Sequence, residues 1–276
     1  MTTLSEALTT GRGTERPFRC QVHDDSNASA SVNVLKGVWI CYACGAKGVV
    51  DGDAAIPSAD ELLTLLKDEE PPRLYAEAWL DTFDADHPSP YWEERFGYQV
   101  ARHFRCGTHP LTGMPTYPLR DASGQVTGVV VRQENEQPKY KYPYGTRTSE
   151  TFFGDRVHGR VVVLVEGAAD VMSLHQAGIP KGWTVKGCYG AGLHYPQARL
   201  IAEMSPSVVI AAYDDDDAGR MATERAAYAL TDIAPVVSHR WGRVGGKDPA
   251  EVPIDLRITG LQDALRATPY ASLTNT

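Results

Sequence analysis

The sequence predicts an α/β protein of several domains: a small cysteine-containing module, a mixed α+β basic segment and a parallel α/β sheet. Three observations lead to this prediction. Cysteines and a histidine are paired within the first 50 residues, two strand-like runs flank turn residues at 121–124, and strands alternate with helices after residue 160. Such alternation is typical of βαβ units and hence of a parallel sheet. With 42% hydrophobic residues in 276, the chain can bury the core that this fold requires.

The first domain, residues 18–50, contains four potential metal ligands in two pairs. They are Cys20, His23, Cys41 and Cys44. Three sulfurs and one nitrogen at these spacings suit one tetrahedral Zn²⁺ in a structural site, because a filled ligand set leaves no position open for catalysis. Strand-like runs at 30–34 and 37–40 lie between the pairs. We expect a zinc ribbon that depends on its metal, since so short a segment buries too little apolar surface alone.

Three residues near the cysteines have expected roles of their own. Gly45 and Gly48 are expected to permit the tight turn that directs backbone amides toward the sulfurs. Trp39 is either part of the module's small core or a platform on which single-stranded bases stack.

Charge is distributed unevenly along the chain. The formal net charge of −8, taken alone, argues against a nucleic-acid partner. Residues 51–90, however, carry 2 basic and 11 acidic residues, and are predicted to be an acidic linker with a short helix over 58–67 that makes few contacts. Residues 1–17 are predicted to be a flexible N-terminus. Most of the negative charge therefore lies outside the predicted domains.

The next segment, residues 91–160, carries 10 basic and 7 acidic residues. Helices are expected up to residue 110, followed by a hairpin with strands at 114–120 and 126–132. Basic residues interleaved with tyrosines suit a single-stranded nucleic-acid track or a nucleoside triphosphate pocket, although any one of these cations could equally be an ordinary solvated side chain. The candidate contacts are Arg120, Arg132, Lys139 and Lys141.

The last segment, residues 161–276, is predicted to form the parallel sheet. Its first strand, 161–165, is a continuous apolar run, as expected of a strand covered on both faces. Further strands are expected at 183–188, 208–213 and 236–241, with helices at 168–176, 197–204 and 218–229.

Carboxylates follow two of these predicted strands. Glu166 ends the first strand, and an aspartate run beginning at Asp214 ends another. Ligands of open parallel sheets bind at this edge, and alternation places Asp214 and Asp216 on one side and Asp215 on the other. If the two strands are neighbours, Glu166, Asp214 and Asp216 converge and would bind Mg²⁺ or Mn²⁺, because oxygen ligands prefer these ions. Further candidate ligands are Asp170 and Asp248. The alternative is a solvated acidic loop.

Metal ions held by carboxylates beside a basic surface fit phosphoryl or nucleotidyl transfer. Motifs of a competing chemistry are absent from the sequence, which has no glycine-rich P-loop and no nucleophile elbow.

These motifs resemble the DnaG-type DNA primases of bacteria and their phages. Residues 18–26 and 39–45 look like the zinc-binding domain of that family. Residues 117–121, the predicted hairpin and residues 138–140 look like the basic half of its RNA polymerase domain.

The other half of that domain is a Toprim fold, and residues 165–170 and 213–220 resemble its two acidic motifs. Topoisomerases, recombination proteins and some nucleases share the Toprim fold. The zinc module ahead of a basic segment is what indicates a primase.

The resemblance implies DNA-templated synthesis of short RNA primers for DNA replication, by metal-dependent nucleotidyl transfer. It implies a single-stranded DNA template and ribonucleoside triphosphates as partners, with a replicative helicase as a further candidate and no membrane. Glu166 would be the catalytic glutamate, Asp214 and Asp216 the paired aspartates, and Arg132 and Lys139 part of the template and nucleotide surface. The expected location is the cytoplasm, or that of the host for a phage protein.

The chain departs from the family pattern in places. Residues 28–30 read Ala-Ser-Ala instead of Pro-Ser-Phe, and residues 248–250 read Asp-Pro-Ala instead of Asp-Pro-Asp. The number of catalytic metals therefore stays open. No helicase-related segment follows residue 276, which fits a compact phage-type primase or a fragment of a longer one. A Toprim nuclease and a non-catalytic single-stranded nucleic-acid-binding module are the alternatives.

Overall fold

The computed structural model divides into two compact units, Met1–Pro71 and Pro72–Thr276. It describes residues 3–10, 15–25, 28–34, 37–50, 73–133, 138–143, 146–156, 159–190 and 192–275. The helix predicted over 58–67 falls outside these residues. No helix among the described residues has the length and apolar character needed to cross a bilayer.

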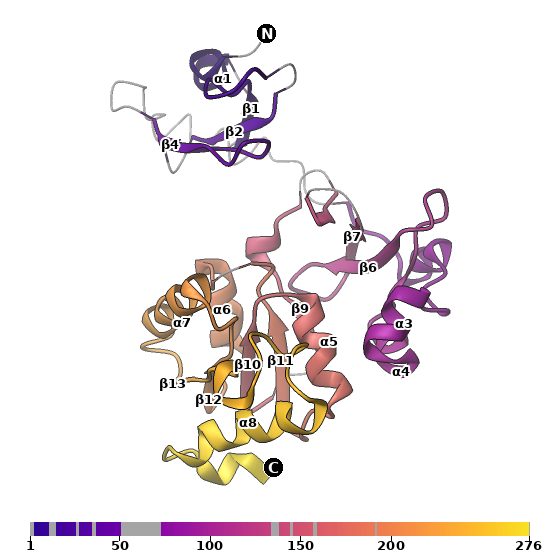
Figure 1. Ribbon diagram of the computed structural model, residues 1–276, viewed down its shortest axis with the longest axis vertical. Helices are drawn as coiled ribbons and strands as arrows, with labels where there is room; N and C mark the ends of the chain where they lie inside the picture. The colour runs from indigo at the N-terminus through magenta and orange to yellow at the C-terminus, as the bar shows by residue number, and fades with distance from the viewer. Residues whose placement is uncertain are drawn as a thin grey trace. The chain divides into compact units, whose positions relative to one another are not determined.

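The first unit is a short helix on a four-stranded antiparallel sheet (Figure 1). Its elements are α1 (Leu4–Thr10), β1 (Glu15–Phe18), β2 (Ala30–Asn33), β3 (Val38–Cys41) and β4 (Lys47–Val49), with the strands in sequence order across the sheet. Ala7, Phe18 and Val32 are among the buried residues of its core. The small sheet and the loops that hold the cysteines agree with the predicted zinc ribbon.

The structure differs from the expectation of a flexible N-terminus. Residues of α1 pack on the sheet through Ala7, which is 1% exposed. The Arg16 guanidinium donates to the carbonyl oxygens of Ala7 at 3.0 Å and Leu8 at 2.6 Å. These carbonyls belong to the last turn of α1, where no intrahelical donor remains for them, so a basic side chain stabilises the helix end.

The second unit begins with short helices and a four-stranded sheet. The helices are η1 (Glu77–Phe83, 3₁₀), α3 (Pro90–Phe96) and α4 (Tyr98–His103), and the strands are β5 (Gly107–Thr108), β6 (Pro115–Arg120), β7 (Val126–Arg132) and β8 (Tyr140–Lys141). The predicted hairpin is present, with Thr116 opposite Val131 and a register shift between Leu119 and Arg120.

Part of the predicted acidic linker belongs to this unit and is not a solvated tether. The Glu77 carboxylate accepts from Arg120 at 2.7 and 2.8 Å and from Arg156 at 3.3 Å. Arg105 donates to Asp81 at 2.6 Å and also contacts Asp86. The acidic residues therefore neutralise arginines of the basic segment, which the separate charge sums of the two segments did not reveal.

The second sheet of this unit is the predicted parallel sheet. Its order is β13-β12-β10-β11-β9, in which β10 (Val161–Val165), β11 (Trp183–Gly187), β12 (Val208–Ala211) and β13 (Val236–Ser238) are parallel. Val163 of the central strand lies opposite both Val185 and Ile210. The edge strand β9 (Phe153–Gly154) pairs antiparallel with β11. The strands that precede Glu166 and Asp214 are thus direct neighbours, as the site prediction required.

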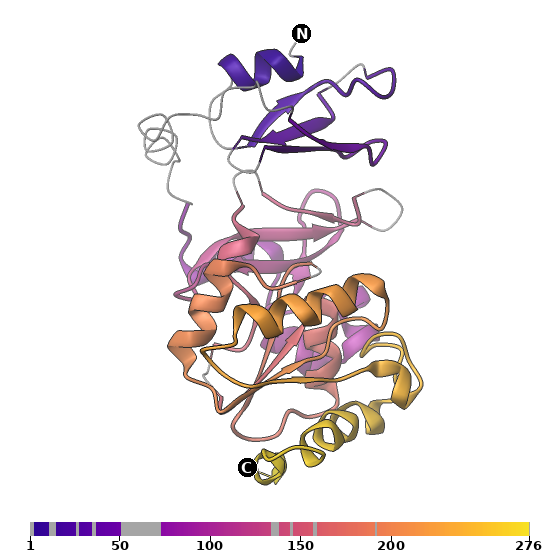
Figure 2. The same ribbon diagram turned by 90° about the vertical axis from the view of Figure 1, so that its left-hand side faces the viewer.

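Helices cover both faces of the parallel sheet (Figures 1 and 2). One face packs against α5 (Ala168–Gln176) and α8 (Ile254–Arg266), and the other against α6 (Tyr195–Met204) and α7 (Asp217–Ala229). The five residues of β10 are 0% exposed because odd and even positions point into different layers. This explains why the strand is a continuous apolar run.

The predicted helices and strands of the sheet are present, with a few differences. The strand expected at 208–213 ends at Ala211, and the short strand β9 was not predicted. The strand expected at 236–241 ends at Ser238, and Trp241 begins the 3₁₀ helix η3 (Trp241–Val244), where its indole N–H donates to the Ala212 carbonyl at 2.9 Å. The helix α8 was not predicted, although together with α5 it packs against one face of the sheet.

Candidate metal centres

The four predicted ligands of the first unit come together. The ligand atoms of Cys20, His23, Cys41 and Cys44 all lie within 4.8 Å of one another. The sulfurs of Cys20 and Cys44 are 3.7 Å apart, and the Cys41 sulfur is 3.9 Å from His23 Nδ1. The first pair follows β1 and the second begins at the end of β3, so the sheet places both loops at one end. A Cys₃His metal site is therefore present.

The Asp25 carboxylate lies next to the ligands of this site and orients them. One of its oxygens accepts from the Cys20 amide at 2.8 Å and the Ser29 hydroxyl at 2.7 Å, and the other lies 3.8 Å from His23 Nε2. A carboxylate at the far nitrogen of a ligating imidazole fixes its orientation. Because Nε2 faces Asp25, Nδ1 is the nitrogen that faces the sulfurs.

Hydrogen-bond donors also surround the Cys41 sulfur. Burial opposes ionisation, but the Ser29 hydroxyl and the amides of Cys44 and Ala43 outweigh it and lower the pKa of Cys41 to about 6. A thiolate at neutral pH is the form that binds metal. Gly45, which directly follows Cys44, adopts a left-handed φ of 73°.

Gly48 serves a different purpose from the one predicted. It lies in β4, where an added Cβ would come within 2.7 Å of the Trp39 indole. Trp39 in turn packs edge-on against Phe18, with ring centroids 5.9 Å apart. These contacts place Trp39 against the small core; a role in stacking nucleic-acid bases stays a prediction.

The predicted carboxylates gather at the carboxyl edge of the parallel sheet. Glu166 follows β10 directly. After the end of β12, the Ala212 amide still donates to the Leu164 carbonyl of β10 at 2.9 Å, so the chain stays beside β10 as it approaches Asp214. Electrostatic coupling joins Glu166, Asp214 and Asp216, and extends to Asp170 and Asp248.

Three of these carboxylates are oriented by backbone amides. Asp216 is the N-cap of α7, and one of its carboxylate oxygens accepts from the Gly219 amide at 2.9 Å. At the start of α5, the Asp170 carboxylate accepts from the Gly167 amide, also at 2.9 Å. Asp248 accepts from the Ala250 and Glu251 amides at 2.8 and 2.9 Å. Each residue thereby keeps its second oxygen at a defined position relative to the sheet edge.

Close backbone approach supports this arrangement at Gly219. A Cβ there would lie 1.9 Å from the Asp214 carbonyl oxygen. Only glycine therefore allows the first turn of α7 to pack this tightly against the loop that carries the aspartates.

Glu166 and Asp214 differ from the other carboxylates. Within the described part of the chain, neither side chain has a hydrogen-bond or ion-pair partner, yet both are partly buried. Burial, together with the neighbouring carboxylates, raises the pKa of Asp214 to about 7 and raises the pKa of Glu166. Burial likewise raises the pKa of Asp170 to about 7. Such unpaired, mutually repelling carboxylates are what a bound cation would stabilise.

The donor set consists of oxygens alone, which fits a hard divalent cation. No three of the described carboxylates at this edge bring oxygens within 4.8 Å of one another, in contrast to the ligand atoms of the Cys₃His site. Repulsion between like charges favours that separation. Lys139 and Lys247 partly compensate the charge of Glu166.

Asp215 has a structural position, as the alternation argument predicted. Its carboxylate binds Arg240 and the Gly242 amide instead of facing Asp214 and Asp216. Asp217, next along, pairs with Arg220 on the surface of α7.

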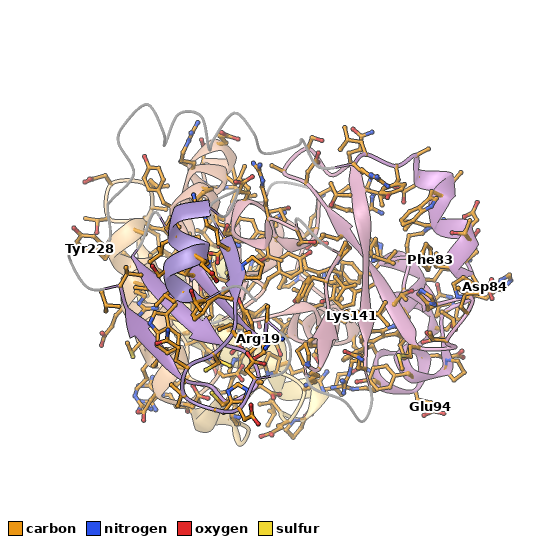
Figure 3. The ribbon with its side chains drawn as sticks, turned by 90° about the horizontal axis from the view of Figure 1, so that it is seen from above. Arg19, Phe83, Asp84, Glu94, Lys141 and Tyr228 are labelled. Atoms are coloured by element: carbon orange, nitrogen blue, oxygen red, sulfur yellow. The ribbon has the colours of Figure 1, made fainter. Side chains whose placement is uncertain are left out.

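The four predicted basic contacts have different surroundings. Arg120 is held by Glu77 and by the Gly124 carbonyl, at 3.1 Å. Arg132 donates from Nε to the Tyr91 hydroxyl at 2.7 Å, and its guanidinium lies over the Tyr91 and Tyr140 rings. Lys139 and Lys141 are exposed, with Lys141 on β8 (Figure 3). The two lysines are thus the most available for a ligand, and all four roles stay predictions.

Sequence reasoning missed several residues of the two centres. Lys247 contributes its carbonyl to the Asp215 amide at 2.8 Å and its charge to Glu166 and Asp214. Its position beside the candidate ligand Asp248 was the available signal. Asp25 lies within the motif at residues 18–26, but the motif did not reveal its part in orienting His23. Tyr91 gave no signal, because its contact with Arg132 joins distant parts of the chain.

Comparison with known proteins finds one matching protein family and several related DNA primases. Residues 163–252 match the family described as Toprim-like. A DNA primase of Synechocystis is 34% identical over 82% of this chain and 48% of its own length, and one of Deinococcus radiodurans is 28% identical over 55% of this chain and 28% of its own length. The chain thus spans less than half the length of these relatives.

The fold has a counterpart among solved structures. The zinc-binding and RNA polymerase domains of the Aquifex aeolicus primase align with a TM-score of 0.52 and 22% identity, covering 92% of this chain and 79% of that one. The predicted zinc ribbon, mixed basic segment and Toprim-like sheet are therefore confirmed as a fold. Together these findings confirm the resemblance inferred from the motifs: the chain is similar to DnaG-type DNA primases, and its fold matches the zinc-binding and RNA polymerase domains of one such primase.

Proposed function

We propose that this protein is a DNA primase, a nucleotidyltransferase that synthesises short RNA primers on a single-stranded DNA template for DNA replication. The observation that carries the proposal is the pair of partly buried, unpartnered carboxylates Glu166 and Asp214 at the carboxyl edge of a Toprim-like sheet. Unpaired carboxylates in such a position cost stability, so their presence is best explained by a charged ligand.

Glu166, Asp214 and Asp216 would hold Mg²⁺ or Mn²⁺, with Asp170 and Asp248 as further candidate ligands. When bound, such ions neutralise the charge of a triphosphate and of the attacking and leaving oxygens. The protein's own part is to fix the ligands: Gly219 and Gly167 amides orient Asp216 and Asp170 before any substrate arrives. No side chain needs to form a covalent bond, because positioning and charge stabilisation account for catalysis of this class.

In the proposed reaction, a ribonucleotide hydroxyl attacks the α-phosphorus of a ribonucleoside triphosphate, and the bond to the pyrophosphate group breaks. Lys139 and Lys247, whose charges reach Glu166, would attract the triphosphate to the acidic edge. Arg132, Lys141 and the paired Arg120 would bind the template or nucleotide. A replicative helicase is a further proposed partner.

We infer that the Cys₃His site binds one Zn²⁺, since three sulfurs and one imidazole favour zinc over magnesium or calcium. Its closed ligand set supports a structural role. The unit it stabilises would contribute to template binding, as the DnaG resemblance implies.

A single assay tests the function. The chain is incubated with Mg²⁺ or Mn²⁺, single-stranded DNA and labelled ribonucleoside triphosphates, and the products are separated by length. Short labelled RNA is expected from the unaltered chain, and Asp214→Ala or Asp216→Ala should abolish it. Retained synthesis in both variants would refute the assignment of the site.

The same gel separates the alternatives. Shortened DNA in place of RNA would indicate a Toprim nuclease, and template binding with neither product would indicate a non-catalytic module. Asp217→Ala is the matched control, because this neighbouring aspartate pairs with Arg220 on the exposed surface of α7 and should leave synthesis unchanged.

A further inference from the structure

We propose that His103, Asp155 and His175 form a second site for a borderline divalent metal ion, separate from both centres described above. One ligand atom of each residue lies within 4.8 Å of the other two. All three residues belong to the second unit, and none was singled out by a sequence motif. The inference does not depend on the proposed function.

The geometry directs three ligand atoms toward one point. His175 Nε2 is 3.1 Å from Asp155 Oδ1, and His103 Nε2 is 4.0 Å from the same oxygen. Both imidazoles thus present the same nitrogen to one carboxylate oxygen. Ligand atoms of a tetrahedral zinc site stand about 3 to 3.5 Å apart, given bonds of about 2 Å, so small side-chain rotations would bring all three onto one ion.

The surroundings hold the ligands in place. Asp155 Oδ2 accepts from the Val185 amide at 3.1 Å, which fixes the carboxylate, and it also lies 3.2 Å from His175 Nε2, so both carboxylate oxygens face this imidazole. The His103 and His175 rings stack with centroids 5.6 Å apart, and Phe104 packs edge-on against His175 at 4.8 Å. Anchored ligands of this kind lower the cost of gathering them around an ion.

Two imidazoles and one carboxylate indicate the class of ion. This donor set suits Zn²⁺, Co²⁺ or Ni²⁺, whereas Mg²⁺ prefers oxygen ligands alone. Three protein ligands leave a coordination position for water. The His103 side chain is 61% exposed, which gives an ion access from solvent. Lys186 donates to the Asp155 main-chain carbonyl, and its positive charge limits the affinity.

A metal here would join three elements of the second unit. His103 ends α4, Asp155 follows the edge strand β9, and His175 lies in the last turn of α5. The ion would therefore connect the helices of the basic segment to the parallel sheet. It would act at the side of the sheet, whereas Glu166 and Asp214 lie at the carboxyl edge of its strands.

The experiment measures metal binding by the full chain with its Cys₃His site already loaded with zinc. Excess zinc is added, unbound metal is removed by dialysis and the bound metal is counted by elemental analysis. We expect two zinc ions per chain, and one in His103→Ala. Titration with Co²⁺ should give visible ligand-field bands without sulfur-to-cobalt charge transfer, which distinguishes this site from the cysteine site.

The variants make the result decisive. His103→Ala and His175→Gln should each weaken the second binding event by at least about 100-fold, since each removes a ligand. His87→Ala is the matched control: its imidazole pairs with Asp84 at 2.8 Å, away from the three ligands, and binding should not change. A single zinc per chain at saturation, or unchanged binding in both ligand variants, would overturn the proposal. A failure of primer synthesis would bear on neither outcome.

Discussion

Arg240 donates to Asp215 from Nε at 2.9 Å, and the second oxygen of that carboxylate accepts the Gly242 amide at 2.9 Å. This pairing connects the aspartate run to the segment after β13. It also separates Asp215 from Asp214, which has no partner among the described residues. The two adjacent aspartates therefore have different expected roles: Asp215 stabilises the fold, and Asp214 binds the metal ion.

We predict that Asp215→Asn lowers stability and leaves primer synthesis largely intact. The Asp215 side chain is 12% exposed, and it loses charge-assisted hydrogen bonds of the kind that contribute about 1.5 to 3 kcal/mol. Chemical denaturation measures the loss. Asp214→Asn is the comparison: it should abolish synthesis without lowering the denaturation midpoint, because it removes a repelling charge. Equal loss of stability in both variants would contradict this assignment.

The acidic edge should make stability depend on pH in the absence of Mg²⁺. The pKa of Asp214 and that of Asp170 are about 7 in the folded chain against an ordinary value of 3.8, so the folded state binds more protons between these values. Stability is then expected to fall as pH rises through this window. Melting temperatures at about pH 5.5 and about pH 7.5 test this, with a smaller decrease expected for Asp214→Asn.

Mg²⁺ should offset that loss. Its stabilising effect is expected to be larger above pH 7, where the carboxylates are ionised, than near pH 5.5. An equal effect at both pH values would show that the ion binds elsewhere.

Loss of zinc is predicted to unfold the first unit alone. Cys41→Ser removes a buried ligand of the Cys₃His site, and the unit has only a small core of its own. We expect less than one zinc per chain at this site and loss of amide protection over residues 15–50 in hydrogen exchange, with α5 to α8 still protected. Cys106→Ala, which replaces a buried thiol of the second unit, should retain the zinc.

Basic residues of the proposed binding surface should differ in whether their loss also lowers the stability of the fold. Lys139→Ala is expected to weaken single-stranded DNA or nucleotide affinity without changing stability, because its ammonium group is exposed near Glu166. Arg120→Ala should lower stability as well as affinity, since it also leaves Glu77 without its bidentate partner. Fluorescence anisotropy and thermal melting distinguish the two. Unchanged affinity in Lys139→Ala would exclude that lysine from the surface.

Arg257 is predicted to hold the Asp248 loop. Its buried guanidinium donates to the carbonyls of Val252 and Ser173, each at 2.9 Å, and to the Gln176 side chain. Arg257→Met keeps the length of the side chain but leaves these acceptors unsatisfied, at a cost of about 2 to 4 kcal/mol. Urea denaturation should show the decrease. A stability equal to that of the unaltered chain would contradict it.

The sequence predicted much of this molecule because its strongest signals are local. The apolar run of β10, the cysteine spacing and the Asp214–Asp216 alternation follow from rules that span a few residues. The contacts of Glu77 could not be predicted in this way, because its partners Arg120 and Arg156 are distant in the chain and the composition of the segment around Glu77 resembles that of a linker. The helix α8 was missed because its apolar residues do not all lie on one face: Leu261 and Leu265 are buried, but Ile254 and Leu256 are exposed.

The short edge strand β9 also determines when the second unit can finish folding. Phe153 and Gly154 pair with Gly187 and Lys186, and a single core extends from Trp92 to Leu273. During synthesis the basic segment leaves the ribosome before the strand that it must pair with, so the backbone of β9 cannot form its pairing with β11 until β11 has emerged. A nascent chain stopped before residue 183 would leave β9 without its neighbouring strand, and the basic segment can therefore complete its junction with the parallel sheet only after β11 has been made.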